Sequence, residues 1–170
     1  IERALEPSDG SPAAFAVSLT PENAMETFAG FKHRWTDCAD IAFLWFALGR
    51  ILDEYGTVGA YVRSLDDPSE PDTGGVMSRF AHGMLQRRDH RFPQGGNRSP
   101  SYLVPAPDAG SASKRTAMLF RWMVRGPDGV DFGLWNFIDP ARLVIPVDRH
   151  IARMAARLGL TERKTVNWRM

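Results

Sequence analysis

The sequence predicts an all-α fold, built as one compact multi-helix domain over residues 1–170. Apolar residues recur at helical spacing in several segments, whereas no segment has a strand pattern strong enough to build a sheet. Helix start and stop signals, a small polar residue before a segment and a glycine after it, bracket most of these segments. With 170 residues, of which 44% are hydrophobic, the chain has the size and composition of one globular domain with a core.

The beginning of the chain is expected to contain one helix. Residues 1–19 show no sustained hydrophobic period, so we expect them to be poorly ordered. Thr20, followed by a proline and an acidic residue, predicts a helix start, and this helix should end near Gly30. The basic and aromatic run FKHRW follows at residues 31–35.

Two more helix starts come next. Asp37 or Asp40 can cap a helix that is apolar on most sides and that Gly56 stops, which predicts a central core helix. Thr57 can cap a shorter helix that reaches about Leu65.

The middle of the chain combines loops with an amphipathic helix. Residues 66–75 are acidic and rich in turn formers, which predicts a loop. Within residues 76–85 the apolar side chains recur at i, i+1, i+4, i+8 and i+9, the spacing of an amphipathic helix. The prolines and glycines of residues 92–110 predict a long connection, either functional or mobile.

The helix predicted over residues 111–125, SASKRTAMLFRWMVR, carries an unusual stripe of positive charge. Ser113 is its expected N-cap. At about 100° per residue, Lys114, Arg121 and Arg125 fall on one narrow line of an otherwise mostly apolar helix. Two arginines four positions apart repel one another by about a few tenths of a kcal/mol. The stripe therefore indicates an anionic ligand or carboxylates elsewhere in the chain, and a solvated helix edge is the simpler alternative.

The last part of the chain is expected to hold a turn, an extended segment and a helix. Residues 126–129 predict the turn, and residues 143–147 are extended because a proline falls within them. Asp148 predicts the start of a helix that Gly159 ends, with apolar residues on one face and arginines on the other. Thr161 can cap a further helix. Because the chain opens without an initiator methionine and stops in this region, we expect a fragment that lacks both ends.

Composition and charge narrow the functional classes. The formal net charge is +1, so a nucleic-acid site must come from local clustering of cations and not from bulk charge. The single cysteine, Cys38, excludes an internal disulfide framework and a four-cysteine metal or iron–sulfur site within this chain. No apolar run reaches the length of a membrane span, and no signal peptide is recognised. We therefore expect a cytoplasmic protein with no membrane partner.

Lys114 and Asp148 are the candidate catalytic residues, because each stands at a predicted helix start. An amine can attack the C1′ carbon of a sugar to form a Schiff base, and a carboxylate can stabilise the positive charge that develops there. The alternative is that Asp148 only caps its helix and that Lys114 is an exposed lysine of a first turn.

Three sequence blocks carry a family resemblance. They are SASKRTAMLFRWMVR, VDFGLW at residues 130–135, and PVDRH at residues 146–150. The chain resembles a bacterial domain family of uncharacterised function with blocks of the form KRxxMxxRWMVR, VDFGxW and PxDxH. The likeness covers most of the chain from Phe31 onward.

The last block is also similar to the helix-hairpin-helix DNA glycosylase superfamily, most of all to its archaeal 8-oxoguanine glycosylase branch. The similar residues are IPVDRHI (145–151) and the RLGL that follows. The resemblance implies a helix-hairpin-helix fold and a DNA repair enzyme that excises oxidised purines without a cofactor. It assigns Lys114 as the nucleophile and Asp148 as its partner. One departure matters: residues 107–111 have one glycine where the superfamily's phosphate-binding hairpin has two, which puts this mode of DNA binding in doubt.

Eight further residues are candidates around this pair. Asp131 is expected to pair with one of the stripe arginines, which would explain part of the stripe without a ligand. His150 points to a different helix face from Asp148, and we interpret it as a structural or surface histidine. The two tryptophans could stack on an extruded base, but we interpret both as core residues. The expected DNA contacts are Arg115, Arg121, Arg125 and Arg149, and their supporting neighbours are Asp131, His150, Trp122 and Trp135.

Three hypotheses stay open. The first is a DNA base-excision glycosylase acting on oxidised purines, with Lys114, Asp148 and the phosphate-holding arginines as its site. The second is a non-catalytic helical module that binds nucleic acid or a protein on the same basic stripe. The third is that these charges only form an internal ion-pair network. The sequence indicates neither the lesion nor the oligomeric state.

Overall fold

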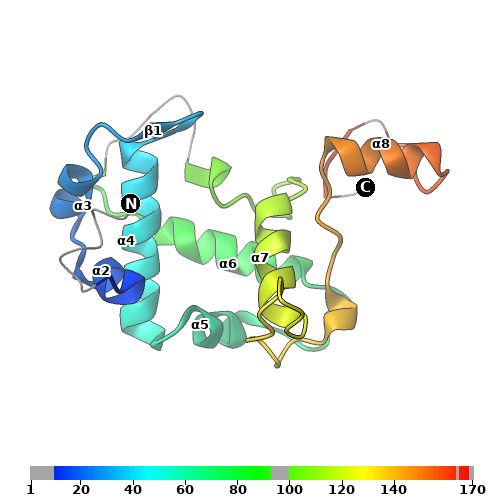
Figure 1. Ribbon diagram of the computed structural model, residues 1–170, viewed down its shortest axis with the longest axis horizontal. Helices are drawn as coiled ribbons and strands as arrows, with labels where there is room; N and C mark the ends of the chain where they lie inside the picture. The colour runs from blue at the N-terminus through cyan, green and yellow to red at the C-terminus, as the bar shows by residue number, and fades with distance from the viewer. Residues whose placement is uncertain (1–9, 93–99, 164, 169–170) are drawn as a thin grey trace. The chain divides into compact units, whose positions relative to one another are not determined.

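The structure is a computed structural model that describes residues 10–92, 100–163 and 165–168 (Figure 1). These residues form seven α-helices and one two-stranded antiparallel sheet, so the predicted all-α class is confirmed. The contacts within the chain divide it into two compact units, each described by itself below. One unit comprises residues 1–61 and 83–103, and the other comprises residues 62–82 and 104–170. The expectation of a single domain stays a prediction.

The first unit is built around the long helix α4 (Cys38–Tyr55). Helices α2 (Pro12–Ser18) and α3 (Pro21–Thr27) pack beside it, as Figure 1 shows. A Cβ atom on Gly49 of α4 would lie 2.0 Å from the carbonyl oxygen of Ala16, so only glycine lets the two backbones approach this closely. The burial of several α4 residues confirms the prediction of a core helix.

The ends of these helices follow the predicted signals. Thr20 caps α3 with its side chain. Asp37 caps α4 in a capping box, in which its Oδ1 accepts from the Asp40 amide at 3.1 Å and Asp40 Oδ2 accepts from the Asp37 amide at 3.1 Å. Gly56, with φ +73°, ends α4.

Two features of this unit are absent from the predictions. Helix α2 lies in the stretch for which no order is expected, because seven residues with two buried side chains, Phe15 and Ala16, are too few to show a period. Residues 1–9 of that stretch lie outside the described part. The run FKHRW contributes to a short hairpin of β1 (Lys32–His33) and β2 (Thr36–Asp37).

Helices α5 (Val58–Leu65) and α6 (Gly74–Gln86) appear where the sequence predicts them. The boundary between the two units falls inside both helices, after Tyr61 and after His82. The Thr57 hydroxyl oxygen accepts from the Ala60 amide at 2.9 Å and so begins α5. The long connection that follows α6 contains a 3-10 turn, η2 (Pro100–Tyr102), and its residues 93–99 lie outside the described part.

The core of the second unit joins α6, helix α7 (Lys114–Val124) and the segment after it. The ring of Phe120 lies 6.4 Å from that of Phe80 and 5.2 Å from that of Trp135, both in edge-to-face arrangements. A 3-10 turn, η3 (Pro140–Arg142), follows Asp139, whose Oδ1 accepts from the Ala141 amide at 2.8 Å.

Helix α8 (Arg149–Arg157) begins after Asp148 as predicted, and Gly159, with φ +71°, follows its end. None of its residues is buried. In the described residues after Gly159 there is no further helix, so the helix start expected at Thr161 is wrong for this stretch. None of the described helices is both long and apolar enough to cross a membrane.

Candidate functional site

Lys114 and Asp148, the two candidate catalytic residues, lie in direct contact in the second unit. The Lys114 ammonium donates a hydrogen bond from Nζ to Asp148 Oδ2 at 2.6 Å. Their side chains are 47% and 31% exposed, so the pair is open to a ligand from solvent. An amine and a carboxylate in such contact can exchange a proton, which is the geometry that acid–base work by this pair requires.

Asp148 holds its orientation because it also caps α8. Its other oxygen, Oδ1, accepts from the amides of His150 at 2.8 Å and Ile151 at 3.0 Å. The Lys114 ammonium, and after it these amides, hold the pKa of the Asp148 carboxyl well below its usual range. The carboxylate therefore stays ionised at neutral pH, and one of its oxygens is directed at the lysine.

Lys114 is positioned by a strained residue. Ser113, buried directly before it, has φ +46°, in the left-handed region that serine seldom adopts. Ser113 stands at the N-cap position of α7 as predicted, but its side chain makes no capping hydrogen bond. Its hydroxyl instead donates to the carbonyl of Pro105 at 2.9 Å. Such strain persists only where surrounding contacts hold it, and it is common at functional sites.

The other two members of the predicted stripe have a carboxylate partner. Arg121 Nε lies 3.4 Å and Arg125 Nη1 lies 3.3 Å from Asp131 Oδ2. Arg125 is also 3.7 Å from Asp128. The expected pairing of Asp131 with the stripe is therefore confirmed, and it accounts for these two arginines without a ligand.

The remaining candidates are exposed residues or part of the core. Arg115 and Arg149 are exposed. His150 is exposed, and its ring Nδ1 lies 2.9 Å from the Arg153 guanidinium, which confirms a surface histidine. Trp135 is a core residue as predicted, at 5% exposure.

The core interpretation of Trp122 is wrong, because its side chain is 37% exposed. Trp122 flanks the charged line of α7, and its backbone carbonyl accepts from the amide of Phe132 at 2.6 Å. The loop that follows α7 is thus hydrogen-bonded to the backbone of Trp122, while the indole ring stays partly in solvent.

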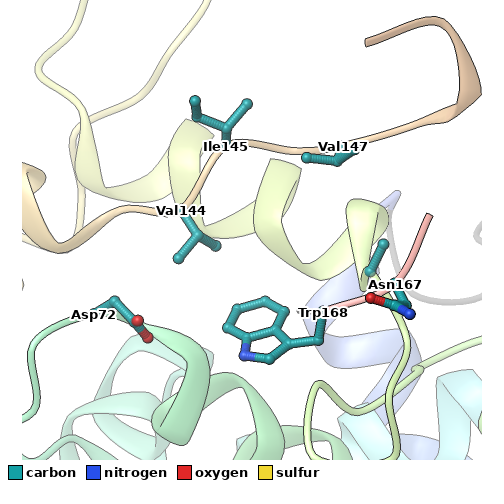
Figure 2. Close-up of a pocket in the computed structure, with 7 residues that line it drawn as sticks. Asp72, Val144, Ile145, Val147, Asn167 and Trp168 are labelled. Atoms are coloured by element: carbon teal, nitrogen blue, oxygen red, sulfur yellow. The ribbon is translucent and has the colours of Figure 1, made fainter. Parts of the chain in front are cut away.

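A pocket of about 330 Å³ lies in the same unit and is lined by seven residues, among which are neither Lys114 nor Asp148. In Figure 2 the indole ring of Trp168 lies between Asp72 and Asn167, below the extended segment that carries Val144 and Val147. Val147 directly precedes Asp148 in the chain, so the Cα atoms of these two residues are about 3.8 Å apart. The lining residues are Asp72, Ala112, Val144, Ile145, Val147, Asn167 and Trp168.

None of these lining residues is among the predicted site residues. The apolar run before Asp148 was the available signal, because an extended apolar segment that leads into a candidate catalytic carboxylate can form a pocket wall. Trp168 is a second signal, a lone tryptophan in a polar stretch. Asp72 carries no such signal, since an aspartate in a turn-rich loop is ordinarily a turn former.

The segment before α7 contains a turn closed by the Gly110 amide, which donates to the Pro107 carbonyl at 2.8 Å. The helix-hairpin-helix part of the expected fold stays a prediction. Among the described residues, no group of three or more His, Cys, Asp or Glu side chains is placed to hold a metal ion.

Comparison with known proteins identifies a family. Neither the curated proteins nor the solved structures contain a significant match. A family model described as "Protein of unknown function (DUF2400)" matches residues 1–170, the whole chain. This agrees with the resemblance to a domain family of uncharacterised function. The chain therefore belongs to the family of unknown function DUF2400.

Proposed function

We propose that this protein is a DNA base-excision glycosylase with lyase activity, in which Lys114 and Asp148 carry the chemistry. The observation that supports it most is the 2.6 Å contact between the lysine Nζ and the aspartate Oδ2, two groups that belong to separate helix starts. An amine for Schiff-base formation and a carboxylate for charge stabilisation are the two groups that such a reaction needs.

The proposed reaction begins from the ion pair. The Lys114 ammonium releases a proton to the departing base, which keeps the electron pair of the broken C1′–N bond. The resulting amine adds to the cationic C1′, and the Asp148 carboxylate accepts the amine's surplus proton. Opening of the C1′–O4′ bond, with the proton held by Asp148 delivered to O4′, leaves a protonated Schiff base between Lys114 and C1′. In the lyase step a proton leaves C2′ and the 3′ phosphate departs with the electron pair of the C3′–O bond, after which water hydrolyses the Schiff base. From the resemblance we expect the excised base to be an oxidised purine.

The non-catalytic alternative has weaker support. A module that binds nucleic acid on the basic stripe of α7 needs Arg121 and Arg125 to be available, and both contact Asp131. The resting positions of these arginines therefore favour support of the fold over phosphate binding.

Borohydride trapping on the complete protein tests the proposal. With a duplex that carries an abasic site or an oxidised guanine, the reductant converts a Schiff base into a stable covalent adduct. We expect the adduct with the wild-type protein and its loss in Lys114→Gln. Lys32→Gln, which changes an exposed lysine of the hairpin, should trap normally.

Asp148→Asn supplies the second arm, because asparagine caps a helix about as well as aspartate and so preserves α8. We expect at least about a 100-fold slower adduct formation, the size of a typical proton-transfer contribution. DNA binding without any adduct would support the non-catalytic module instead. Normal trapping by Asp148→Asn would overturn the role of the carboxylate.

A further inference from the structure

We infer that the pocket lined by Asp72 and Trp168 binds a primary alkylammonium ion, an organic cation with N–H donors at one end and an apolar tail. All seven lining residues belong to the second unit, and the inference does not depend on the proposed base-excision function. It rests on the charge of the lining, on an aromatic ring beside that charge and on an apolar wall.

The charge of the lining favours a cation. Asp72 is the one residue with a formal charge among the seven, and no lysine or arginine among them offsets it. Its Oδ1 accepts from the Gly74 amide at 2.7 Å, which orients the carboxylate. Within the described part of the chain its Oδ2 has no hydrogen-bond partner. Because an ionised carboxylate only accepts, this oxygen suits a donor, and an ammonium N–H is the strongest because both partners are charged.

An aromatic ring lies beside this carboxylate. Figure 2 shows the Trp168 indole next to Asp72, and both side chains belong to the pocket lining. The face of an aromatic ring carries negative potential and attracts ammonium groups, and the indole of tryptophan does so most strongly. The carboxylate and the indole therefore attract the same kind of charged group, whereas both disfavour an anion such as phosphate.

The rest of the lining suits a hydrocarbon tail. Val144, Ile145 and Val147 come from one extended segment, which Figure 2 shows above Trp168. Methylene groups gain free energy when such side chains remove them from water, a gain that a bare metal ion does not have. The pocket volume of about 330 Å³ is near the lower end for small-molecule sites, which fits a small amine.

Backbone contacts hold the pocket in shape before any ligand binds. The Thr73 amide donates to the Arg142 carbonyl at 3.0 Å, which ties the loop before α6 to the turn η3. The Trp168 amide donates to the Gly110 carbonyl at 3.3 Å. At Gly74 a Cβ atom would overlap the indole ring, so only glycine lets the ring lie there. A pre-formed site of this kind loses little entropy on binding.

Titration of the complete protein with probes of equal chain length and different charge tests the inference. The probes are butylammonium, 1-butanol and butanoate, with sodium chloride at the same ionic strength as the salt control. The readout is the NMR signal of the Trp168 indole N–H, which Trp168→Phe assigns by removing it. We expect a saturable shift with butylammonium, at least about tenfold weaker binding of 1-butanol, and no response to butanoate.

Asp72→Asn tests the role of the carboxylate. The asparagine carbonyl can still accept from the Gly74 amide, so the loop is kept, while an amide group replaces the free oxygen. We expect butylammonium to bind about tenfold more weakly, since it loses its charged acceptor. Binding of 1-butanol should change little, because an alcohol can either donate or accept, and this shows that the pocket persists. Asp108→Asn, at an exposed aspartate of the same unit that contacts His82, should leave both affinities unchanged.

Three results would overturn the inference: equal affinity for butylammonium and 1-butanol, a preference for butylammonium that Asp72→Asn retains, or a Trp168 signal that no probe shifts. Nα-acetyl-lysine methylamide, which carries the same ammonium on a peptide-like body, distinguishes two sources of the cation. Tighter binding of this compound than of butylammonium supports a lysine side chain of a partner protein, and weaker binding supports a free amine.

Discussion

The two oxygens of the Asp148 carboxylate accept hydrogen bonds from different partners. Oδ1 caps α8, as the structural alternative requires, and Oδ2 contacts Lys114, as the proposed catalysis requires. The alternatives drawn from the sequence are therefore not exclusive. Because the hydrogen bonds of the cap hold Oδ1 in place, they also fix the direction of Oδ2 and so the position of the contact with Lys114.

The lysine contact predicts the titration of Asp148. Because Lys114 and the α8 amides bind the ionised form, the folded pKa of Asp148 lies below the ordinary value of 3.8. The stabilisation is complete above the ordinary pKa and is lost as pH falls through the lower, folded pKa. We expect Lys114→Met to raise the Asp148 pKa toward 3.8 and to weaken the acid dependence of stability. NMR titration of the carboxyl carbon measures it.

The control for this titration is Lys32→Met, which removes an exposed lysine of the first unit and should leave the Asp148 pKa unchanged. An equal Asp148 pKa in wild-type and Lys114→Met would show that the contact is absent in solution.

Helix α7 shows how a charged stripe can be neutralised by its own chain. Its arginines lie against Asp131, whose side chain is fully buried but accepts no hydrogen bond on either oxygen within the described residues. The interaction is therefore mainly Coulombic. Helix α8 differs, because its large apolar residues stay in solvent, with Ile151 40% and Met154 58% exposed.

The Coulombic character of this cluster predicts a salt-dependent stability change. In Asp131→Asn the two arginines lose their shared carboxylate and repel one another. We expect the free energy of unfolding to fall by about 1 kcal/mol at low salt, and the difference to shrink at high salt because ions screen the charges. Urea unfolding at two ionic strengths measures both effects.

Asp128→Asn is the comparison variant, since asparagine can still accept from the amides of Val130 and Asp131, and only the exposed 3.7 Å contact with Arg125 is lost. We expect it to change the free energy of unfolding less than Asp131→Asn does. A higher stability of Asp131→Asn would instead mean that the desolvation of the buried carboxylate costs more free energy than its attraction to the two arginines provides.

Arg142 connects segments of the second unit that are distant in sequence. Its guanidinium makes two hydrogen bonds of 3.0 Å to Asp66, and both side chains are largely buried. It also donates to the carbonyls of Asp67 at 2.8 Å and Glu70 at 3.1 Å. Hydrogen bonding to Asp66 raises the pKa of Arg142 above its usual value. This contact holds the loop before α6 against the segment that leads to the pocket.

We expect Arg142→Met to lower the free energy of unfolding by about 3–5 kcal/mol, because it leaves the buried Asp66 carboxylate without a counter-charge. That is a large share of the about 5–15 kcal/mol that stabilises a typical domain. Arg91→Met, which removes an exposed arginine paired with Asp89 and Glu22, should change stability little. Equal urea midpoints for the two variants would contradict the proposed role of Arg142.

Much of the local structure could be predicted, because its causes are local. The caps at Thr20, Asp37 and Asp148 act within about one helical turn, so the residues that begin a helix are visible in sequence order. The exposure of Trp122 could not be predicted, because it depends on which side of α7 the following loop, with Phe132, covers. Helix α2 was likewise beyond a period-based prediction because its burial depends on α4.

The sequence by itself determined the all-α class, most helix boundaries, the pairing of Asp131 with the stripe, and the two residues that carry the candidate chemistry. Only the tertiary structure decided that Lys114 and Asp148 touch, and that Asp72, Val144 and Trp168 enclose one pocket. The physical reason is range. Capping and helical periodicity act between neighbours along the chain, whereas an ion pair or a pocket wall depends on how packing brings distant segments together.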